Sequence, residues 1–165
     1  MPNEYIATTS RCSRNVFVKH GWYCNIWLNG GAAGGGKTYA LLLEPLRHIN
    51  NRDFAAVIFR KNANQIFTTG GLWDSSFTIY PTIGGRPIKT PKPYWRFPSG
   101  MKVGFNHLEA DKDLLSWQGS QIAMIAFDEL THFSKQIFFY MLSRNRSTCG
   151  VRPYIRCTTN PDSDS

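Results

Sequence analysis

The segment from Gly31 to Thr38 reads GAAGGGKT, and an apolar run with the character of a helix follows it. Glycine loses more backbone freedom on folding than any other residue, so a cluster of glycines needs a physical reason. The segment fits the pattern G-x-x-x-x-G-K-[ST], in which small residues let the backbone N–H groups surround a phosphate. The sequence therefore predicts a phosphate-binding loop at the start of a helix.

Each residue type in this loop has a chemical reason. Lys37 is expected to reach the β- and γ-phosphates of a nucleotide, and the Thr38 hydroxyl is expected to ligate Mg²⁺. A flexible glycine linker is the alternative, but the apolar segments on both sides of the loop argue against it. The residues predicted to contact ATP are Gly31, Ala32, Ala33, Gly34, Gly35, Gly36, Lys37 and Thr38.

Short apolar runs alternate with helix-like segments along the rest of the chain. The predicted strands are Tyr23–Leu28, Ala55–Phe59, Ile122–Phe127 and Tyr154–Thr159, and the predicted helices are Thr38–Ile49 and Ser134–Asn145. Pro45 should end or kink the first helix near Glu44, because proline cannot continue the helical hydrogen bonding. Continuously apolar strands separated by helices predict an α/β fold with a mostly parallel sheet, covered by helices on both faces.

Two regions fall outside this alternation. Residues 1–20 have no clear period and are interpreted as an N-terminal arm, which leaves residues 21–165 as the α/β domain. Residues 70–105 are interpreted as an inserted hairpin and loop region. Glycine and proline are frequent in its first part, and Tyr94–Phe105 reads as a hairpin around a Pro-Ser-Gly turn.

An acidic pair follows the third predicted strand. Asp128 and Glu129 come directly after the apolar run IAMIAF. In phosphate-loop enzymes an aspartate at this place holds Mg²⁺, and the adjacent acid can act as the general base that activates water. A strand-end turn with two surface acids is the alternative. Together with the glycine loop, the pair predicts an enzyme that hydrolyses ATP to ADP and phosphate, with Lys37 and Glu129 as catalytic residues.

Polar residues also end the last predicted strand. Thr158, Thr159 and Asn160 stand where side chains can sense the γ-phosphate or position the attacking water. An ordinary exit into an Asn-Pro turn explains the same residues equally well.

The overall charge favours a polyanionic partner. The chain of 165 residues has a formal net charge of +8 at pH 7, which is typical of proteins that contact nucleic acid. The N-terminal residues lack the apolar core of a signal peptide, and no apolar run approaches the ~18 residues that a membrane span requires. We therefore expect a cytoplasmic protein that is neither secreted nor membrane-bound.

The segments GGAAGGGKT, IAFDELTHF, MLSRNRS and TTNPD, in this order, resemble the ATPase domain of a tailed-phage or prophage terminase large subunit. The resemblance implies a RecA-like, three-layer P-loop NTPase fold and a motor that moves double-stranded DNA into a procapsid. It implies that Gly31–Thr38 is the Walker A motif and that Asp128 with Glu129 is the Walker B motif with its catalytic glutamate. Thr158, Thr159 and Asn160 correspond to the coupling motif.

The resemblance also implies partners. Relatives assemble as a homo-oligomeric ring on the portal protein, with help from a small terminase subunit, so the expected location is the host cytoplasm and, transiently, the procapsid. Terminase large subunits normally continue into an RNase H-like nuclease domain. Since the sequence ends at Ser165 with no spaced acidic triad after the coupling motif, we expect a fragment without nuclease activity.

One departure from the family concerns arginine. Many relatives carry an arginine inside the Walker A loop or an Arg-Gly pair before Walker B, where this chain has Ala32–Gly35 and Gln118–Gly119. The arginine finger is therefore unassigned, and a neighbouring subunit of a ring can also supply it. The candidates within the chain are Arg60, Arg144 and Arg146.

Two other functions stay open on the sequence alone. The chain has features of a different DNA-directed P-loop ATPase, such as a helicase or a RecA-like recombinase. It is also compatible with a non-hydrolysing nucleotide-binding module that takes part in assembly.

Overall fold

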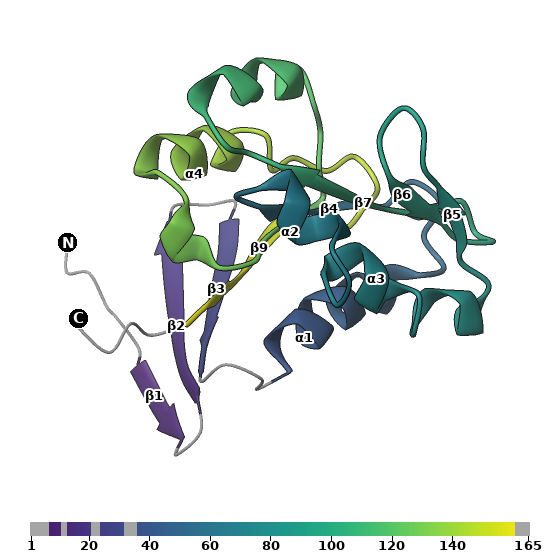
Figure 1. The fold of residues 1–165 in the computed structure, drawn as a ribbon. Helices are drawn as coiled ribbons and strands as arrows, with labels where there is room; N and C mark the ends of the chain where they lie inside the picture. The colour runs from purple at the N-terminus through teal and green to yellow at the C-terminus, as the bar shows by residue number, and fades with distance from the viewer. Residues whose placement is uncertain (1–6, 11–12, 21–23, 32–35, 161–165) are drawn as a thin grey trace.

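The chain forms a mixed sheet with helices on both of its faces (Figure 1). The structure, a computed structural model, describes residues 7–10, 13–20, 24–31 and 36–160. Within these residues the sheet has nine strands in the order β1-β2-β3-β9-β8-β4-β7-β6-β5. The strands are β1 (Ala7–Ser10), β2 (Ser13–His20), β3 (Cys24–Gly30), β4 (Ala55–Arg60), β5 (Arg86–Ile88), β6 (Tyr94–Arg96), β7 (Lys102–His107), β8 (Met124–Phe127) and β9 (Tyr154–Thr159).

The centre of the sheet is parallel and its two sides are antiparallel. β3, β9, β8, β4 and β7 run in the same direction. β1 and β2 extend one side through antiparallel pairing with β3, and β6 and β5 extend the other side beyond β7. The four predicted strands form as β3, β4, β8 and β9, although β8 begins at Met124 rather than Ile122 and Tyr23 lies outside the described residues. In addition, part of the segment interpreted as an N-terminal arm forms β1 and β2.

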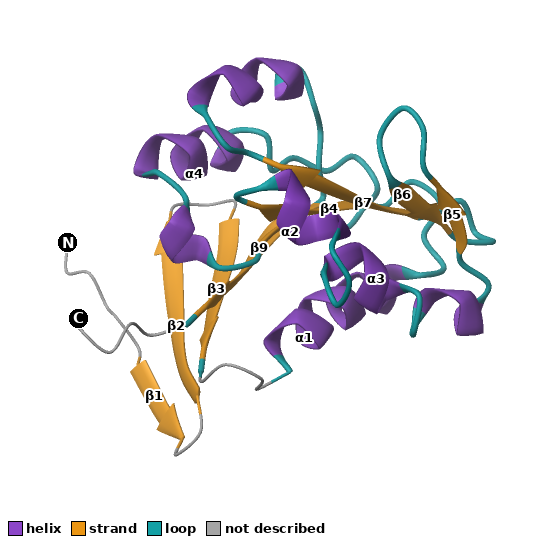
Figure 2. Cartoon of the chain, in the orientation of Figure 1, coloured by secondary structure: helices purple, strands orange, loops and turns teal. Residues whose placement is uncertain are grey.

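Side chains of the central strands alternate between two apolar clusters, one on each face of the sheet. Met124 and Ala126 of β8 belong to the first cluster, whereas Ile125 and Phe127 belong to the second. This alternation is the two-residue period of an extended strand that is buried on both faces. The layers are helix, sheet and helix (Figure 2), which confirms the predicted three-layer α/β fold.

Helices of different segments cover the two faces. The first face is covered by α1 (Lys37–Leu43), α2 (Ala63–Phe67) and α3 (Leu72–Ser76), through buried residues such as Leu42, Ile66 and Trp73. The second face is covered by α4 (Lys135–Leu142) and a 3-10 helix, η4 (Asp111–Trp117), through Met141 and Trp117. In Figure 1, α4 lies above the sheet and α1 and α3 lie below it. The remaining short 3-10 helices are η2 (Glu44–His48), η3 (Tyr80–Ile83) and η5 (Leu130–His132).

The ends of the two predicted helices follow from their sequences. α1 ends at Leu43 and the chain tightens into η2, whose second residue is Pro45. Proline cannot donate to the preceding turn, so the expected break occurs where the sequence placed it. α4 begins after Ser134, whose side-chain oxygen accepts a hydrogen bond from the Ile137 backbone N–H and so caps the helix.

The hairpin predicted within residues 94–105 forms from β6 and β7, but its second strand has a larger role than an insertion. β7 pairs with β6 on one side and, in parallel, with β4 on the other. It therefore belongs to the parallel centre of the sheet and carries core residues such as Val103 and Phe105.

Candidate active site

A cavity of about 380 Å³ opens at the carboxyl ends of the parallel strands. Parallel strands bring their carboxyl ends to one edge of the sheet, which is where open α/β folds bind ligands. The cavity therefore collects residues that are far apart in the sequence. It is lined by Gly36, Lys37, Thr38, Tyr39, Arg60, Gly70, Ser75, Asp128, Glu129, Thr158 and Asn160.

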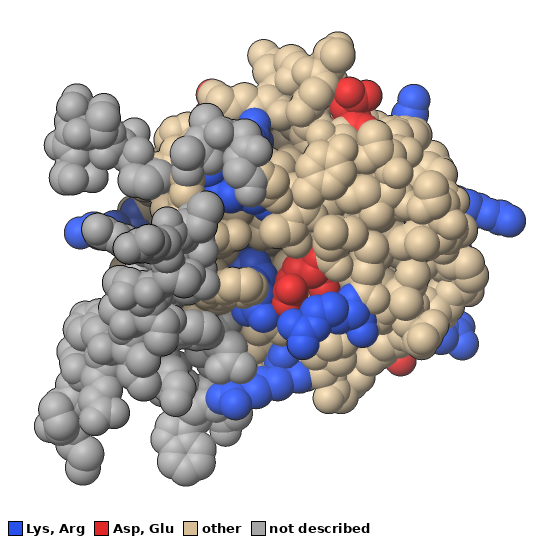
Figure 3. Space-filling view, turned by 90° about the horizontal axis from the view of Figure 1, so that it is seen from below, with Lys and Arg blue, Asp and Glu red and all other residues tan. Residues whose placement is uncertain are grey.

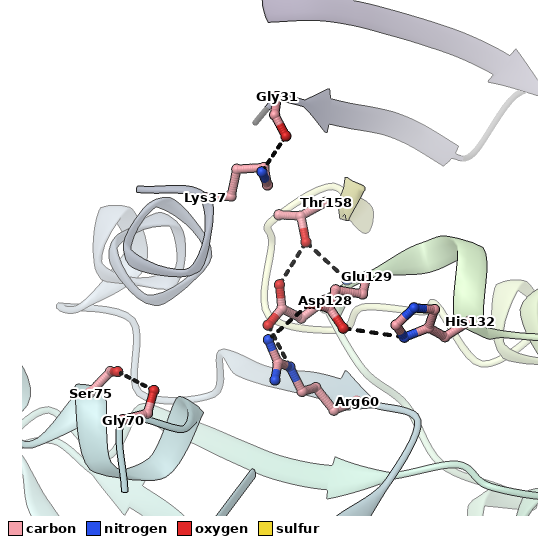
Figure 4. Close-up of polar contacts among 9 residues, drawn as sticks. All are labelled: Gly31, Lys37, Arg60, Gly70, Ser75, Asp128, Glu129, His132 and Thr158. Atoms are coloured by element: carbon pink, nitrogen blue, oxygen red, sulfur yellow. Dashed lines mark hydrogen bonds and ion pairs between the residues drawn. The ribbon is translucent and has the colours of Figure 1, made fainter. Parts of the chain in front are cut away.

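The described part of the predicted phosphate loop forms one wall of this cavity. Gly36 has a φ of 71°, a left-handed conformation that glycine adopts without steric cost, and α1 begins directly after it. The Lys37 amino group donates a hydrogen bond to the Gly31 carbonyl, directly after β3 (Figure 4). Ala32, Ala33, Gly34 and Gly35 lie outside the described residues.

Asp128 lies on the opposite wall and makes two strong polar contacts. Its side chain is 2% exposed, and its backbone N–H donates to the Phe59 carbonyl of the neighbouring strand. One carboxylate oxygen accepts from Arg60 Nε at 2.8 Å, and the other accepts from the Thr158 hydroxyl at 2.6 Å. A buried carboxylate is costly without such partners, so this pairing makes an ionised Asp128 tolerable at the end of β8.

Glu129 follows Asp128 in a left-handed backbone conformation, with φ 62° and ψ 63°. This conformation costs about 1–2 kcal/mol for a residue other than glycine and persists only where its surroundings hold it. The Thr158 hydroxyl accepts the Glu129 backbone N–H at 3.0 Å. The Glu129 carboxylate lies 3.5 Å from an Arg60 terminal nitrogen and 3.2 Å from His132 Nδ1 (Figure 4).

Thr158 is therefore the centre of a small network between two strands. It is 1% exposed, donates to Asp128 and accepts from Glu129. Of the other two residues predicted beside it, Thr159 donates to the Asn160 carbonyl at 3.2 Å, and Asn160 reaches the cavity. The buried Asn160 Oδ1 has no hydrogen-bond partner among the described residues. Next to this network, burial raises the pKa of the Cys157 thiol to about 12, so it stays neutral.

The three arginine candidates lie in different places. Arg60 is inside the cavity and contacts both acids. Arg144 and Arg146 lie beyond the C-terminus of α4, near the amino ends of the strands, because the Arg144 carbonyl accepts from Ile122, just before β8. Arg144 also packs its guanidinium 4.9 Å from the centre of the Tyr140 ring. Neither residue lines the cavity described above.

Four residues of the site were not singled out from the sequence, and the first of them, Tyr39, directly follows the predicted loop. Gly70 and Ser75 come from the region interpreted as an excursion, yet they line the cavity opposite α1. The Gly70 backbone N–H is held by Asp74, and Ser75 donates to the Gly70 carbonyl. His132, in η5, contacts Glu129. It stands three residues after Glu129, and this spacing brings side chains together in helical turns. The spacing could therefore have predicted the contact from the sequence.

The donor set fits a magnesium nucleotide. The described residues contain no group of three or more His, Cys, Asp or Glu side chains that could hold a metal alone. Mg²⁺ in phosphate-transfer sites usually takes only one or two protein oxygens, with water and phosphate oxygens as the remaining ligands. The Thr38 hydroxyl and the Asp128 carboxylate line the same cavity and supply such oxygens.

The fold is that of an α/β domain with a parallel sheet centre, and its cavity at the carboxyl edge of the strands collects a lysine, a threonine and two acids. A family model described as "Terminase large subunit, T4likevirus-type, N-terminal" matches residues 28–165. The chain therefore belongs to the N-terminal domain family of terminase large subunits, which confirms the resemblance in its motifs. No curated protein sequence matches the chain.

Two solved structures share the fold at low sequence identity. The large terminase of a thermophilic bacteriophage superimposes with a TM-score of 0.62 and 14% identity over 86% of this chain. The N-terminal domain of the DNA packaging ATPase of bacteriophage phi29 superimposes with a TM-score of 0.54 and 16% identity over 83% of this chain. The alignments cover 34% of the thermophilic phage terminase and 72% of the phi29 chain, so this chain spans about a third of the former.

Proposed function

We propose that this chain is the motor part of a terminase large subunit, which binds ATP with Mg²⁺ and hydrolyses it to move double-stranded viral DNA into a procapsid. The observation that carries the proposal is the single cavity lined by Lys37, Thr38, Asp128, Glu129 and Thr158. Membership of the terminase family supports the DNA-packaging role. The phi29 protein with the same fold is described as a DNA packaging ATPase, which supports the same proposed role.

Each residue has a part in the proposed reaction. Lys37 binds the β- and γ-phosphates, and Thr38 and Asp128 hold Mg²⁺, which neutralises charge on the phosphates when it is bound. Glu129 takes a proton from the attacking water. Its left-handed backbone and its contacts with Thr158, Arg60 and His132 fix where its carboxylate points.

The link from hydrolysis to movement is proposed to run through Thr158, Thr159 and Asn160. Thr158 donates to the Asp128 carboxylate and accepts from the Glu129 backbone N–H, so one hydroxyl group links both residues to β9. Among the arginine candidates, the position of Arg60 in the cavity suits a contact with phosphate. Arg144 and Arg146 suit only a finger offered to a neighbouring subunit, because they lie away from this cavity.

The proposal includes the assembly in which such a motor works. Its partners are double-stranded DNA, the portal protein and a small terminase subunit, and copies of the chain form a ring on the portal. The protein acts in the host cytoplasm and on the procapsid. None of the helices among the described residues has the length and apolar character that crossing a bilayer requires.

Two substitutions test the proposed reaction. Lys37→Ala should weaken ATP binding about 10- to 100-fold, the effect of losing a charge-assisted hydrogen bond worth ~1.5–3 kcal/mol. Glu129→Gln should leave ATP binding intact and lower turnover about 10²- to 10⁴-fold, the usual contribution of a general base. Binding is measured with a fluorescent ATP analogue and turnover by phosphate release. Lys135→Ala and Glu109→Gln, at exposed positions outside the cavity, are the matched controls.

The same measurements, together with a duplex-unwinding assay and turnover assays in the presence of single- or double-stranded DNA, separate the alternatives. ATP binding that depends on Lys37, with no ATP turnover that depends on Glu129, would favour the non-hydrolysing module. Unwinding of a duplex, or activation by single strands over duplex DNA, would favour a helicase or a recombinase. Turnover unchanged in both variants would contradict the proposed site.

A further inference from the structure

Three basic residues stand side by side on the three strands at the end of the sheet. In the register of the sheet, Arg86 of β5 pairs with Arg96 of β6, and Arg96 pairs with Lys102 of β7. Directly paired residues project to the same face, and neighbouring strands lie about 4.8 Å apart. The three side chains therefore start from one line across the strands, which we call the cation row.

The cation row faces solvent. Arg86, Arg96 and Lys102 are all exposed. The residues next to them, Trp95 and Val103, are fully buried in the apolar cluster on the other face of the sheet. The alternation of the strands therefore fixes the direction of the row: it projects from the face opposite α1 and α3, on the part of the sheet that helices leave open.

The row lacks internal compensation. Like charges directly opposite each other destabilise a sheet. Among the described residues, the ion pairs involve Arg47, Arg60, His132 and Arg156, and none includes a member of the row. The only ring contact of the row in the described residues joins Lys102 to Tyr94, at 6.0 Å. Figure 3 shows the molecule from below, where acidic side chains near the middle of the view have basic side chains beside them.

The row is also separate from the nucleotide cavity. Lys102 pairs with Ala55, the first residue of β4, whereas the cavity residue Arg60 is the last. These positions are about 16 Å apart along the strand, at ~3.3 Å per residue. A ligand can therefore bind at the row while the cavity is occupied by ATP.

We propose that the cation row binds the phosphate backbone of double-stranded DNA. Three cations at a spacing of ~4.8 Å cover about 10 Å, and one strand of duplex DNA places about three phosphates in that length of helix axis. The row thus matches a polyanion with regularly spaced charges. This inference rests on the proposed function, because it locates a surface for the DNA that the motor would move.

An acidic protein surface is the competing partner, and the row suits it less well. Centres of protein interfaces are rich in aromatic and other apolar anchors. The large exposed apolar side chains among the described residues are Tyr39, Leu43, Phe67, Phe77, Ile83, Leu115 and Phe139, and none belongs to β5, β6 or β7. A flat row of charges without an anchor is typical of contacts with a phosphate backbone, which are independent of sequence.

The experiment measures binding of the protein to a labelled 30-base-pair duplex of mixed sequence between 50 and 200 mM salt. The test variant is Arg86→Gln/Arg96→Gln/Lys102→Gln. Removal of three phosphate contacts should reduce the slope of log affinity against log salt by about 2.7. Wild-type affinity should therefore fall about 40-fold more than that of the variant across this range.

Two further variants separate charge at the row from other effects. Arg47→Gln/Lys112→Gln/Lys135→Gln removes the same charge from exposed positions elsewhere and should leave the salt slope of the wild type nearly unchanged. Arg86→Lys/Arg96→Lys keeps the charges and should retain the slope, which also shows that the strands tolerate substitution.

The outcomes distinguish this inference from the proposed function. A slope in the test variant equal to that of the control variant overturns the inference, and so does a wild-type protein that does not bind the duplex. Basal ATP turnover is measured in the same samples and should be unchanged in the test variant. Loss of duplex binding with normal turnover supports the inference, whereas absent turnover in the wild type contradicts the proposed function and leaves the binding result to be judged on its own. An acidic protein can be tested in the same way as the duplex. If its binding depends on the cation row while binding of the duplex does not, the surface belongs to a protein partner and the inference is wrong.

Discussion

Charges of opposite sign meet at the carboxyl ends of the strands, whereas charges of one sign line up at β5, β6 and β7. In the cavity, Arg60 contacts Asp128 at 2.8 Å and Glu129 at 3.5 Å. In the cation row, Arg96 stands between two other cations without an acidic partner among the described residues. Both places hold charge, but within the described part of the chain only the first pairs its charges with charges of opposite sign.

The difference shows in which region the charged side chains have partners of opposite charge within the described part of the protein. The Asp128 carboxylate is held by an arginine and a hydroxyl of the same chain, so we expect these contacts to contribute to stability. Among the described residues the cation row has no ion pair, and its charges repel each other. Stability measurements therefore test the comparison directly: substitutions in the cavity should destabilise the protein, and substitution in the row should stabilise it.

The largest effect is expected from Arg60→Met. Asp128 is 2% exposed and Arg60 is 18% exposed, so the substitution leaves a buried carboxylate without its cationic partner. Breaking a buried pair in this way costs about 3 kcal/mol or more. The measurement is the free energy of unfolding in urea. Arg47→Met is the matched control, because its side chain is 67% exposed and its pair with Glu44 should contribute less than ~1 kcal/mol. Equal effects of the two substitutions would show that the Arg60 pair behaves as a surface pair.

An intermediate effect is expected from Thr158→Val, which keeps the shape of the side chain but removes its hydroxyl. Asp128 then loses a donor at 2.6 Å and the Glu129 N–H loses its acceptor. An unsatisfied buried group costs about 1–3 kcal/mol, measured as the change in the free energy of unfolding. Thr159→Val is the control, since that hydroxyl only donates to the Asn160 carbonyl at 3.2 Å and is half-buried. If Thr158→Val lowers the free energy of unfolding no more than Thr159→Val does, the Thr158 hydroxyl does not hold Asp128 and Glu129 in place.

The sequence predicted those parts of the site that depend on local chemistry. The glycine loop before α1, the acids after β8 and the polar end of β9 are each encoded in one short segment. Their meeting in one cavity follows from the prediction of parallel strands, since such strands share a carboxyl edge. Pro45 similarly marked the end of α1 through a property of the residue itself.

Contacts between distant segments could not be predicted in the same way. The alternation in residues 102–107 identifies a strand, but nothing local says that β7 pairs in parallel with β4. Arg60 and Asp128 are 68 positions apart, and their contact depends on β4 and β8 being neighbours. The left-handed conformation of Glu129 is likewise imposed by its surroundings, because glutamate has no preference for it. The cation row needs the register of two strand pairs, which the basic residues alone do not specify.

The smallest effect, and the one with the opposite sign, is expected from Arg96→Gln. Arg96 is opposite both Arg86 and Lys102, and like charges directly opposite each other destabilise a sheet. Neutralising the middle residue removes both repulsions, so the free energy of unfolding should rise. Arg86→Gln removes only one repulsion and should have about half the effect. In 1 M salt the Debye length falls to ~3 Å, so the gain of both variants should vanish. A loss of stability in Arg96→Gln at low salt, or a gain that persists in 1 M salt, would show that the row is held by something other than the charges of its three members. The proposed contrast between paired charges in the cavity and unpaired charges in the cation row would then be wrong.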